Sequence, residues 1–486
     1  MFSEPVKDGM GGGHGNLKVS KESRKEQTTP TGGWPEEVRV ETGGTSGAQQ
    51  AETAAENGND DAKVVSTSNL LEWILGRENM TDAYEKVMAN KGSHGIDNMT
   101  VDQLKPYLWD NWEQIKRELL DGTYKPKAVR RVEIPKPDGG IRLLGIPTVL
   151  DRTIQQAIAQ ILNKIFDKDF SEFSYGFRKG RSAHDAIKAA QNYISEGYKW
   201  VVDMDLEKFF DRVNHDKLMS LIAGKVDDKR LLKLIRRYLE SGVMINGLEV
   251  ITEDGVPQGS PLSPLLSNIM LDELDKELEK RGHKFVRYAD DCNVYVKSKR
   301  AGERVYQSIK VFLETKLKLK INEEKSAVDR PEKRKFLGFS FYRKKGEPRI
   351  RVHERSFKRL REKIKRVTNR NWGVSMEYRL KKLAEITTGW LNYFGVADCE
   401  SRLQQIDGWI RRRLRACIWK QWKKIKTKYK SLRKLGLSEE KAWEFANTRK
   451  SYWRISKSPI LSTTITNQRL EIKGFKSLVK RYHLVH

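Results

Sequence analysis

Two adjacent aspartates, Asp290 and Asp291, lie between two short apolar segments, residues 285–288 and 293–296. The alternation of side chains in both segments predicts two strands joined by a tight hairpin turn. Neighbouring carboxylates on such a turn repel one another unless a cation lies between them. The pair therefore indicates a cation site, although an isolated Asp-Asp pair is more often a solvated turn.

A further pair of acids belongs to another predicted strand, residues 199–206. The strand period of two places Asp203 and Asp205 on one face. Asp205 together with Asp290 and Asp291 could hold two Mg²⁺ ions, which would bind the attacking 3′-oxygen and the leaving pyrophosphate oxygen of an in-line phosphoryl transfer. Three aspartates suffice because Mg²⁺ keeps most of its waters. The alternative, an ion pair with a nearby arginine, is expected for one of Asp203 and Asp205.

These acids belong to an ordered series of motifs, which are residues 131–142, Tyr-Gly-Phe-Arg at 175–178, the Asp205 segment, residues 255–264, Tyr-Ala-Asp-Asp at 288–291, residues 322–326 and Phe-Leu-Gly-Phe at 336–339. Tyr-Ala-Asp-Asp resembles the catalytic box of reverse transcriptases. The ordered set resembles bacterial group II intron-encoded reverse transcriptase/maturases over nearly all of the chain after Ser66. The resemblance implies an RNA-directed DNA polymerase, a nucleotidyltransferase in which Asp205, Asp290 and Asp291 are catalytic.

The resemblance also implies nucleotide-binding residues. Lys136 and Arg142 flank a Pro-Asp-Gly-Gly turn, which predicts a hairpin that holds two cations against the incoming triphosphate. The aromatic residue after the first catalytic aspartate excludes a ribose 2′-hydroxyl in the family. We favour Phe210 for this position, with Phe209 as the alternative.

Three more contacts are expected around the templating base and the nucleotide. By resemblance, Gln258 and Gly259 contact the base pair, and Lys325 is a candidate proton donor to pyrophosphate. Lys325 could equally be an ordinary surface lysine. Ser263 is a suitable N-cap, with Pro264 in the first turn, for a helix whose apolar face runs from Leu265 to Leu274.

Composition agrees with a polyanionic partner. The net charge is +28 over 486 residues, and it is concentrated after residue 65, because residues 1–65 contain 7 Lys and Arg against 11 Asp and Glu. That leader is rich in small polar residues and is predicted to be disordered.

No apolar run reaches membrane-span length, so we expect no membrane partner. The three cysteines, Cys292, Cys399 and Cys417, are expected to be reduced thiols in a bacterial cytoplasmic protein, associated with the nucleoid when bound to target DNA.

The fold class expected from these features is α+β, a right-hand polymerase with fingers, a palm carrying an antiparallel sheet, and an α-helical thumb/maturase domain. The predicted divisions are a disordered leader (1–66), an N-terminal extension (67–127), fingers and palm (128–347), thumb/maturase (348–430) and a DNA-binding tail (431–486). Nothing after Trp419 supplies the cysteine pairs of the nuclease domain found in many relatives, so we expect an endonuclease-lacking type.

A strongly basic helix is predicted from His353 to Thr368, with Phe357, Leu360, Ile364 and Val367 on its apolar face. Its cations repel one another unless phosphates neutralise them, although a solvated charged face is the common alternative. A second basic run follows at residues 409–415. The expected RNA- or DNA-binding residues are Arg355, Lys358, Arg359, Arg361, Lys365, Arg411, Arg412 and Arg413.

The function predicted from all of this is copying of an RNA template from a DNA primer with deoxynucleoside triphosphates. The protein is also expected to bind its group II intron RNA and to assist the splicing of that intron. In the family this complex inserts into target DNA and copies the intron there. Two alternatives are a splicing cofactor that binds RNA without polymerising, and a reverse transcriptase of a defence or retron system. The intact acids disfavour the first, and the region after Glu354 disfavours the second. The oligomeric state is left open.

Overall fold

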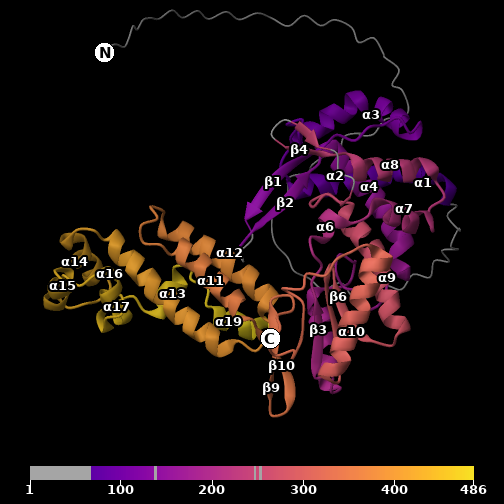
Figure 1. Ribbon diagram of the computed structural model, residues 1–486. Coiled ribbons are helices and arrows are strands. Elements are labelled where there is room, and N and C mark those ends of the chain that lie inside the picture. Colours follow the sequence, from indigo (N-terminus) through magenta and orange to yellow (C-terminus); the bar gives the residue numbers. More distant parts are fainter. Residues whose placement is uncertain (1–66, 136–138, 246–247, 251–253, 486) are drawn as a thin grey trace, which may run out of the picture.

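A computed structural model describes residues 67–135, 139–245, 248–250 and 254–485 (Figure 1). The predictions for the 1–66 leader and for Lys136 therefore lie outside the described residues. Within the described residues, no helix combines the length and apolarity needed to cross a bilayer.

Among the described residues, three α-helices precede the first strand. They are α1 (Leu70–Ile74), α2 (Arg77–Asn90) and α3 (Leu104–Leu120). Helix α2 buries Ala83 and Val87 and packs along α4 (Val149–Phe166). Thr148 caps α4, because its hydroxyl accepts a hydrogen bond from the backbone N–H of Asp151.

The fingers contain the predicted hairpin, formed by β1 (Val129–Pro135) and β2 (Ile141–Ile146) in antiparallel register. Strand β1 also pairs in parallel with β4 (Val243–Ile245), which pairs with β5 (Leu248–Val250), giving the order β2-β1-β4-β5. The helices that follow α4 along the chain are α5 (Ala183–Ser195), α6 (Phe209–Arg212), α7 (His215–Ala223), α8 (Lys229–Glu240) and α9 (Ser263–Lys280).

The palm sheet has the order β6-β7-β3-β8, and every neighbouring pair in it is antiparallel. Its strands are β6 (Lys284–Tyr288), β7 (Asp291–Val296), β3 (Trp200–Met204) and β8 (Ala327–Asp329), with α10 (Lys299–Phe312) packed against it. The antiparallel palm sheet of the predicted α+β polymerase fold is therefore confirmed.

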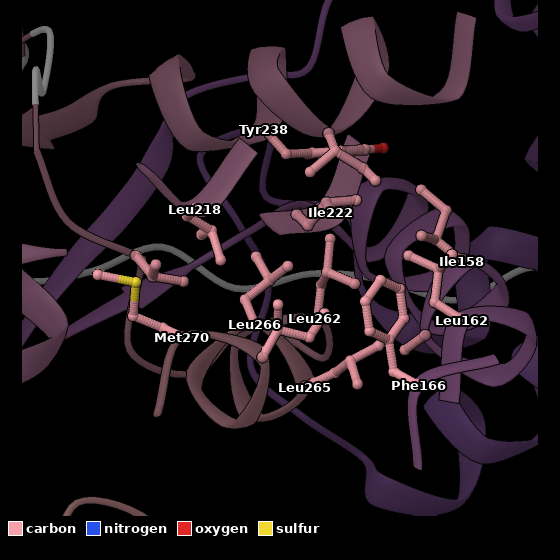
Figure 2. Packing of buried hydrophobic residues seen from close by; sticks show 14 of the residues in the cluster. Ile158, Leu162, Phe166, Leu218, Ile222, Tyr238, Leu262, Leu265, Leu266 and Met270 are labelled. Atoms are coloured by element: carbon pink, nitrogen blue, oxygen red, sulfur yellow. The ribbon is translucent and has the colours of Figure 1, made fainter. Parts of the chain in front are cut away.

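The palm sheet has a different hydrophobic core on each face, because successive side chains of a strand point to opposite faces. Val202 and Val294 join a core shared with the N-terminal helices and α9. Figure 2 shows part of it, where Leu265 of α9 lies beside Phe166 of α4. Val201, Val286 and Tyr295 join a second core, to which α5 and the C-terminal helices contribute.

The C-terminal region is helical after a hairpin of β9 (Phe339–Lys344) and β10 (Glu347–Val352). The expected boundary at residue 347 falls on the first residue of β10. The helices that follow are α11 (Glu354–Val367), α12 (Met376–Phe394), α13 (Glu400–Gln421), α14 (Ile425–Lys434), α15 (Glu439–Ala446), α16 (Tyr452–Ile455), α17 (Pro459–Thr464), α18 (Asn467–Ile472) and α19 (Leu478–Val485). Helix α19 returns to pack against α12 and α13, so the last segment shares the core of the thumb (Figure 1).

Candidate active site

The palm sheet brings the three predicted catalytic aspartates together at one end of its two central strands, β3 and β7. Strands β3 and β7 are antiparallel, with Met204 opposite Cys292. Asp205 directly follows β3, and Asp291 begins β7, so both lie at the same end of the paired strands. The strand register, rather than proximity in sequence, therefore positions Asp205 beside the hairpin acids.

The β6–β7 hairpin closes through a two-residue turn, because Tyr288 pairs with Asp291 and only Ala289 and Asp290 lie between them. Ala289 has a left-handed backbone, with φ of +56°. The backbone of Gly176 lies directly against this turn, where a Cβ would come within 2.3 Å of the Ala289 nitrogen. Glycine is therefore required at position 176 of the Tyr-Gly-Phe-Arg motif.

A buried arginine, Arg287, stabilises the hairpin turn. The Arg287 guanidinium donates a 3.0 Å hydrogen bond to the carbonyl oxygen of Ala289 and forms an ion pair with Asp275 at 2.5 Å. Both side chains of the pair are completely buried. Arg287 also donates to Ser174 and Asn268, so its donors are satisfied without water.

Sequence reasoning missed Arg287 and Asp275. The available indication was a charge inside a predicted strand, between Val286 and Tyr288, where a buried position requires a partner. The partner could not be found from sequence because Asp275 belongs to helix α9.

Burial, with the charges of neighbouring carboxylates, raises the pKa of both hairpin aspartates. Burial within the cleft, followed by the charges of Asp290, Asp203 and Asp205, raises the pKa of Asp291 to about 7. Burial and the charge of Asp205 also raise the pKa of Asp290, while Arg142 acts in the opposite direction. A cation between these groups would relieve the repulsion.

Asp203 and Asp205 have separate environments. Asp203 forms an ion pair with Arg334 at 2.7 Å, which confirms that one of the two acids is an arginine partner. Asp205 instead lies 3.4 Å from the ammonium of Lys325. Because the Lys325 side chain is 62% exposed, it can leave this contact when another cation approaches.

The donor set fits Mg²⁺. In the part of the chain that the structure describes, no three His, Cys, Asp or Glu side chains converge closely enough to form a complete metal cage. Mg²⁺ does not need one, because one or two carboxylates with waters and substrate phosphates complete its octahedral shell. Asp205, Asp290 and Asp291 are the residues that would hold it.

A cleft of about 1230 Å³ contains the aspartates and most of the predicted nucleotide-binding residues. Its lining includes Asp205, Asp290, Asp291, Arg142, Phe209, Phe210, Gln258, Gly259 and Lys325. Residues far apart in sequence, from the fingers hairpin to the loop before β8, thus line one space. The cleft is large enough for a nucleotide beside a base pair, since small-ligand sites usually occupy about 300–1,000 Å³.

The two phenylalanines differ in exposure. Phe209 is 2% exposed and belongs to the core, whereas Phe210 is only partly buried. The carbonyl of Phe210 accepts a hydrogen bond from the N–H of Val256, which connects it to the loop that carries Gln258. This arrangement supports Phe210 over Phe209 as the residue facing a bound sugar.

The loop before α9 is held against the fingers hairpin. The Gly145 N–H donates to the Gln258 carbonyl at 2.8 Å, and Gly259 has a left-handed φ of +108°. The prediction that Ser263 caps α9 is wrong. Leu262 occupies the N-cap position, and the Ser263 hydroxyl instead donates to the Pro257 carbonyl at 2.6 Å, which closes the loop.

The predicted RNA-binding residues divide into two groups. On α11, Phe357, Leu360, Ile364 and Val367 are buried, which confirms the amphipathic pattern. A groove of about 430 Å³ is lined by Arg355, Lys358, Arg361 and Lys365 with Trp409, together with Glu354 and Glu362.

The arginines of α13 have protein partners instead. Arg413 donates to the Thr368 hydroxyl, Arg412 lies 3.7 Å from the ring centroid of Trp453, and Arg411 is 4.0 Å from Asp407. The sequence could not separate these cations from those of α11, because both segments have similar composition.

Comparisons with known proteins agree with this geometry. A model of reverse transcriptase (RNA-dependent DNA polymerase) matches residues 134–341, and a model of the group II intron maturase-specific domain matches residues 357–436. Protein YkfC of Escherichia coli (strain K12) is 32% identical, and the match covers 58% of this chain and 85% of YkfC. The chain belongs to the group II intron reverse transcriptase/maturase family.

The match to another relative of this group II intron reverse transcriptase/maturase spans a smaller share of that relative. Group II intron-encoded protein LtrA of Lactococcus lactis subsp. cremoris is 31% identical, and the match spans 56% of each chain. Among solved structures, telomerase from Candida albicans, in complex with a fragment of telomeric RNA, has a TM-score of 0.38 at 13% identity. That match covers 71% of this chain and 69% of the telomerase. A partial Cas6-RT-Cas1–Cas2 complex has a TM-score of 0.34 at 26% identity, with coverage of 51% and 42%.

Proposed function

We propose that this chain polymerises DNA on an RNA template in the cleft that contains Asp205, Asp290 and Asp291. The observation that carries the proposal is the convergence of these aspartates with Arg142, Phe210 and Gln258 in one cleft within the matched reverse transcriptase region. Two bound Mg²⁺ ions would supply activation of the primer 3′-hydroxyl and charge neutralisation at the leaving pyrophosphate.

The protein groups have separate roles in this proposal. The three aspartates hold the cations, and Arg142, which is exposed in the cleft, neutralises triphosphate charge together with Lys136. Phe210 excludes a ribose 2′-hydroxyl. Gln258 and Gly259 face the base pair, which can approach the backbone of Gly259 closely because glycine has no side chain. Lys325, released from Asp205, donates a proton to pyrophosphate.

The basic face of α11 extends the proposal to a group II intron RNA. Arg355, Lys358, Arg361 and Lys365 are exposed, and Trp409 supplies an aromatic surface beside them. This face lies inside the matched maturase region except for Arg355, which precedes it by two residues. The complex of protein and intron RNA would act in the bacterial cytoplasm, where it would insert at a target DNA site and copy the intron from a DNA primer.

Primer extension on an RNA template with a DNA primer, Mg²⁺ and deoxynucleotides tests the proposal. Asp290→Asn and Asp291→Asn should each abolish extension, while affinity for the template–primer should change little. The control is Asp216→Asn, which removes a highly exposed carboxylate outside the cleft lining and should leave extension unchanged. Undiminished extension in either hairpin variant would contradict the site. Absent extension in the wild type, with tight RNA binding, would favour the splicing cofactor.

A further inference from the structure

A second basic concavity lies at the end of the palm sheet opposite the catalytic turn. This palm-end groove has a volume of about 460 Å³ and lies between the start of β6, the end of β7 and helix α10. Its charged and aromatic lining comprises Tyr198, Arg281, His283, Lys284, Tyr295, Lys297 and Arg304. Lys284 is four residues before Tyr288 along β6, so the groove is about 13 Å from the turn measured along the strand.

The palm-end groove has an excess of positive charge. Four of its lining residues are Lys or Arg and none is Asp or Glu. Arg281 is paired with Glu277, which lies outside the lining. Among the described residues, Lys284, Lys297 and Arg304 have no carboxylate within ion-pair distance. Such clustered, unneutralised cations repel one another, and a bound polyanion would relieve that repulsion.

Aromatic rings accompany these cations. The Lys297 ammonium lies 5.6 Å from the ring centroid of Tyr198, and the Lys284 ammonium lies 5.8 Å from that of Tyr193. Tyr198 is only partly buried, so part of its ring is accessible from the groove. A phosphate contact beside an accessible ring is the combination that binds single-stranded nucleic acid, in which bases are free to stack.

The basic surface continues past the groove along the same end of the sheet. Arg330 follows β8 and lies 4.5 Å from the ring centroid of Trp200, while its guanidinium donates to the Lys199 carbonyl. Lys199 and Arg330 are both exposed. Trp200 on β3 pairs with Val296 on β7, the residue before Lys297, and β3 also pairs with β8. Lys199 and Arg330 therefore extend the basic surface from β7 across β3 to β8.

We propose that the palm-end groove binds single-stranded RNA outside the polymerase cleft. The cations from β6, β7 and α10 contact successive phosphates, and Tyr198 stacks on a base. This surface is separate from both the cleft and the α11 face, since it shares no lining residue with either. The proposal does not depend on polymerase activity.

The test measures binding of a second RNA while the cleft is occupied. Protein saturated with a chain-terminated template–primer duplex is titrated with a labelled single-stranded RNA of about 20 nucleotides, and anisotropy is followed at several salt concentrations. Lys297→Ser combined with Arg304→Ser should weaken binding about 3- to 30-fold, as expected for two exposed ion pairs. The slope of log affinity against log salt should fall by about 1.4.

A matched control removes the same charge elsewhere. Lys229→Ser combined with Lys233→Ser changes two exposed lysines of α8 that line neither the cleft nor the palm-end groove, and it should leave the affinity and slope near those of the wild type. Extension of a short template–primer should be unchanged in both double variants, which confirms that they fold. Equal effects of the two double variants, or no effect of Lys297→Ser with Arg304→Ser, would overturn the proposal.

Two further measurements define the ligand. Tyr198→Leu should weaken binding without changing the salt slope, because stacking releases no counterions. An acidic peptide should compete poorly with the RNA. Unchanged affinity in Tyr198→Leu would overturn base stacking, and equal competition by the peptide would overturn RNA as the ligand.

Discussion

The guanidinium of Arg287 donates directly to the carbonyl oxygen of Ala289, the residue whose left-handed backbone turns the chain between β6 and Asp290. A side chain with no solvent exposure thus holds the main chain of the catalytic hairpin. Because Arg287 is itself oriented by Asp275, helix α9 is connected to the catalytic turn through two side chains.

Breaking this buried pair should destabilise the protein strongly. Arg287→Met leaves Asp275 buried without its partner, and we expect the free energy of unfolding to fall by about 3–5 kcal/mol. Adding Asp275→Leu should restore part of it, since no buried charge then remains unpaired, while the Ala289 carbonyl still lacks its donor. Lys382→Met, which breaks an exposed pair with Glu385, should cost less than about 1 kcal/mol. Denaturant unfolding of the four proteins measures these differences; a small loss in Arg287→Met would contradict the role of the pair.

Phe209 and Phe210 should respond differently to truncation. Phe210→Ala opens the cleft beside the sugar and should increase ribonucleotide incorporation without a large loss of stability. Phe209→Ala removes a side chain that is 2% exposed and should cost about 3–5 kcal/mol. The measurements are the ratio of ribo- to deoxynucleotide incorporation and the thermal midpoint. Altered sugar discrimination in Phe209→Ala alone would reverse the assignment.

Asp151 should make stability depend on pH. Its carboxylate is buried, and it accepts hydrogen bonds from the hydroxyls of Thr148 and Tyr124 at 2.7 and 2.8 Å. Burial nevertheless raises the pKa of Asp151 above its ordinary value of about 4. Between that value and the raised one, the native protein retains a proton that the unfolded chain has released, so the free energy of unfolding falls as pH rises.

Asp151→Asn should remove this contribution. Urea unfolding from pH 4 upward should show a steeper fall in the wild type than in Asp151→Asn, by up to about 1.4 kcal/mol for each pH unit within the window. Asp216→Asn, which changes an exposed acid, should keep the wild-type slope. Parallel curves for the wild type and Asp151→Asn would contradict the raised pKa.

The cations of α11 should determine the salt dependence of intron RNA binding. Replacing Lys358, Arg361 and Lys365 with Ser should weaken binding and reduce the slope of log affinity against log salt by about 2 to 3. Replacing Arg413 should instead lower stability, because its guanidinium donates to Thr368 and to the Lys365 carbonyl. Filter binding across salt concentrations and thermal unfolding separate the two effects. An unchanged slope in the triple variant would mean that this face is merely solvated.

Much of this architecture could be predicted because its determinants are local. The period of two predicted both strands around Asp290, and the apolar spacing predicted α11 with its four buried apolar residues. The sequence predicted that either Asp203 or Asp205 would pair with an arginine, but not which one. That depends on the position of Arg334, which is far away in the sequence.

Other features depend on contacts that no local pattern contains. The Ser263 hydroxyl bonds the Pro257 carbonyl, so the helix start differs from what propensity favours. The role of Arg287 depends on α9, and the partners of the α13 arginines come from several different segments. Tertiary packing, which decides these cases, cannot be derived from spacing alone.

The palm sheet, whose two faces close two different cores, limits how this enzyme can be divided. A fragment ending near residue 347 would keep helix α5 on this face of the sheet but would lose β10 and the C-terminal helices that complete the second core. Its newly exposed apolar face would favour aggregation over an isolated polymerase. The reverse transcriptase region and the helical region after it therefore share one hydrophobic framework, and a substitution in the second core can affect both.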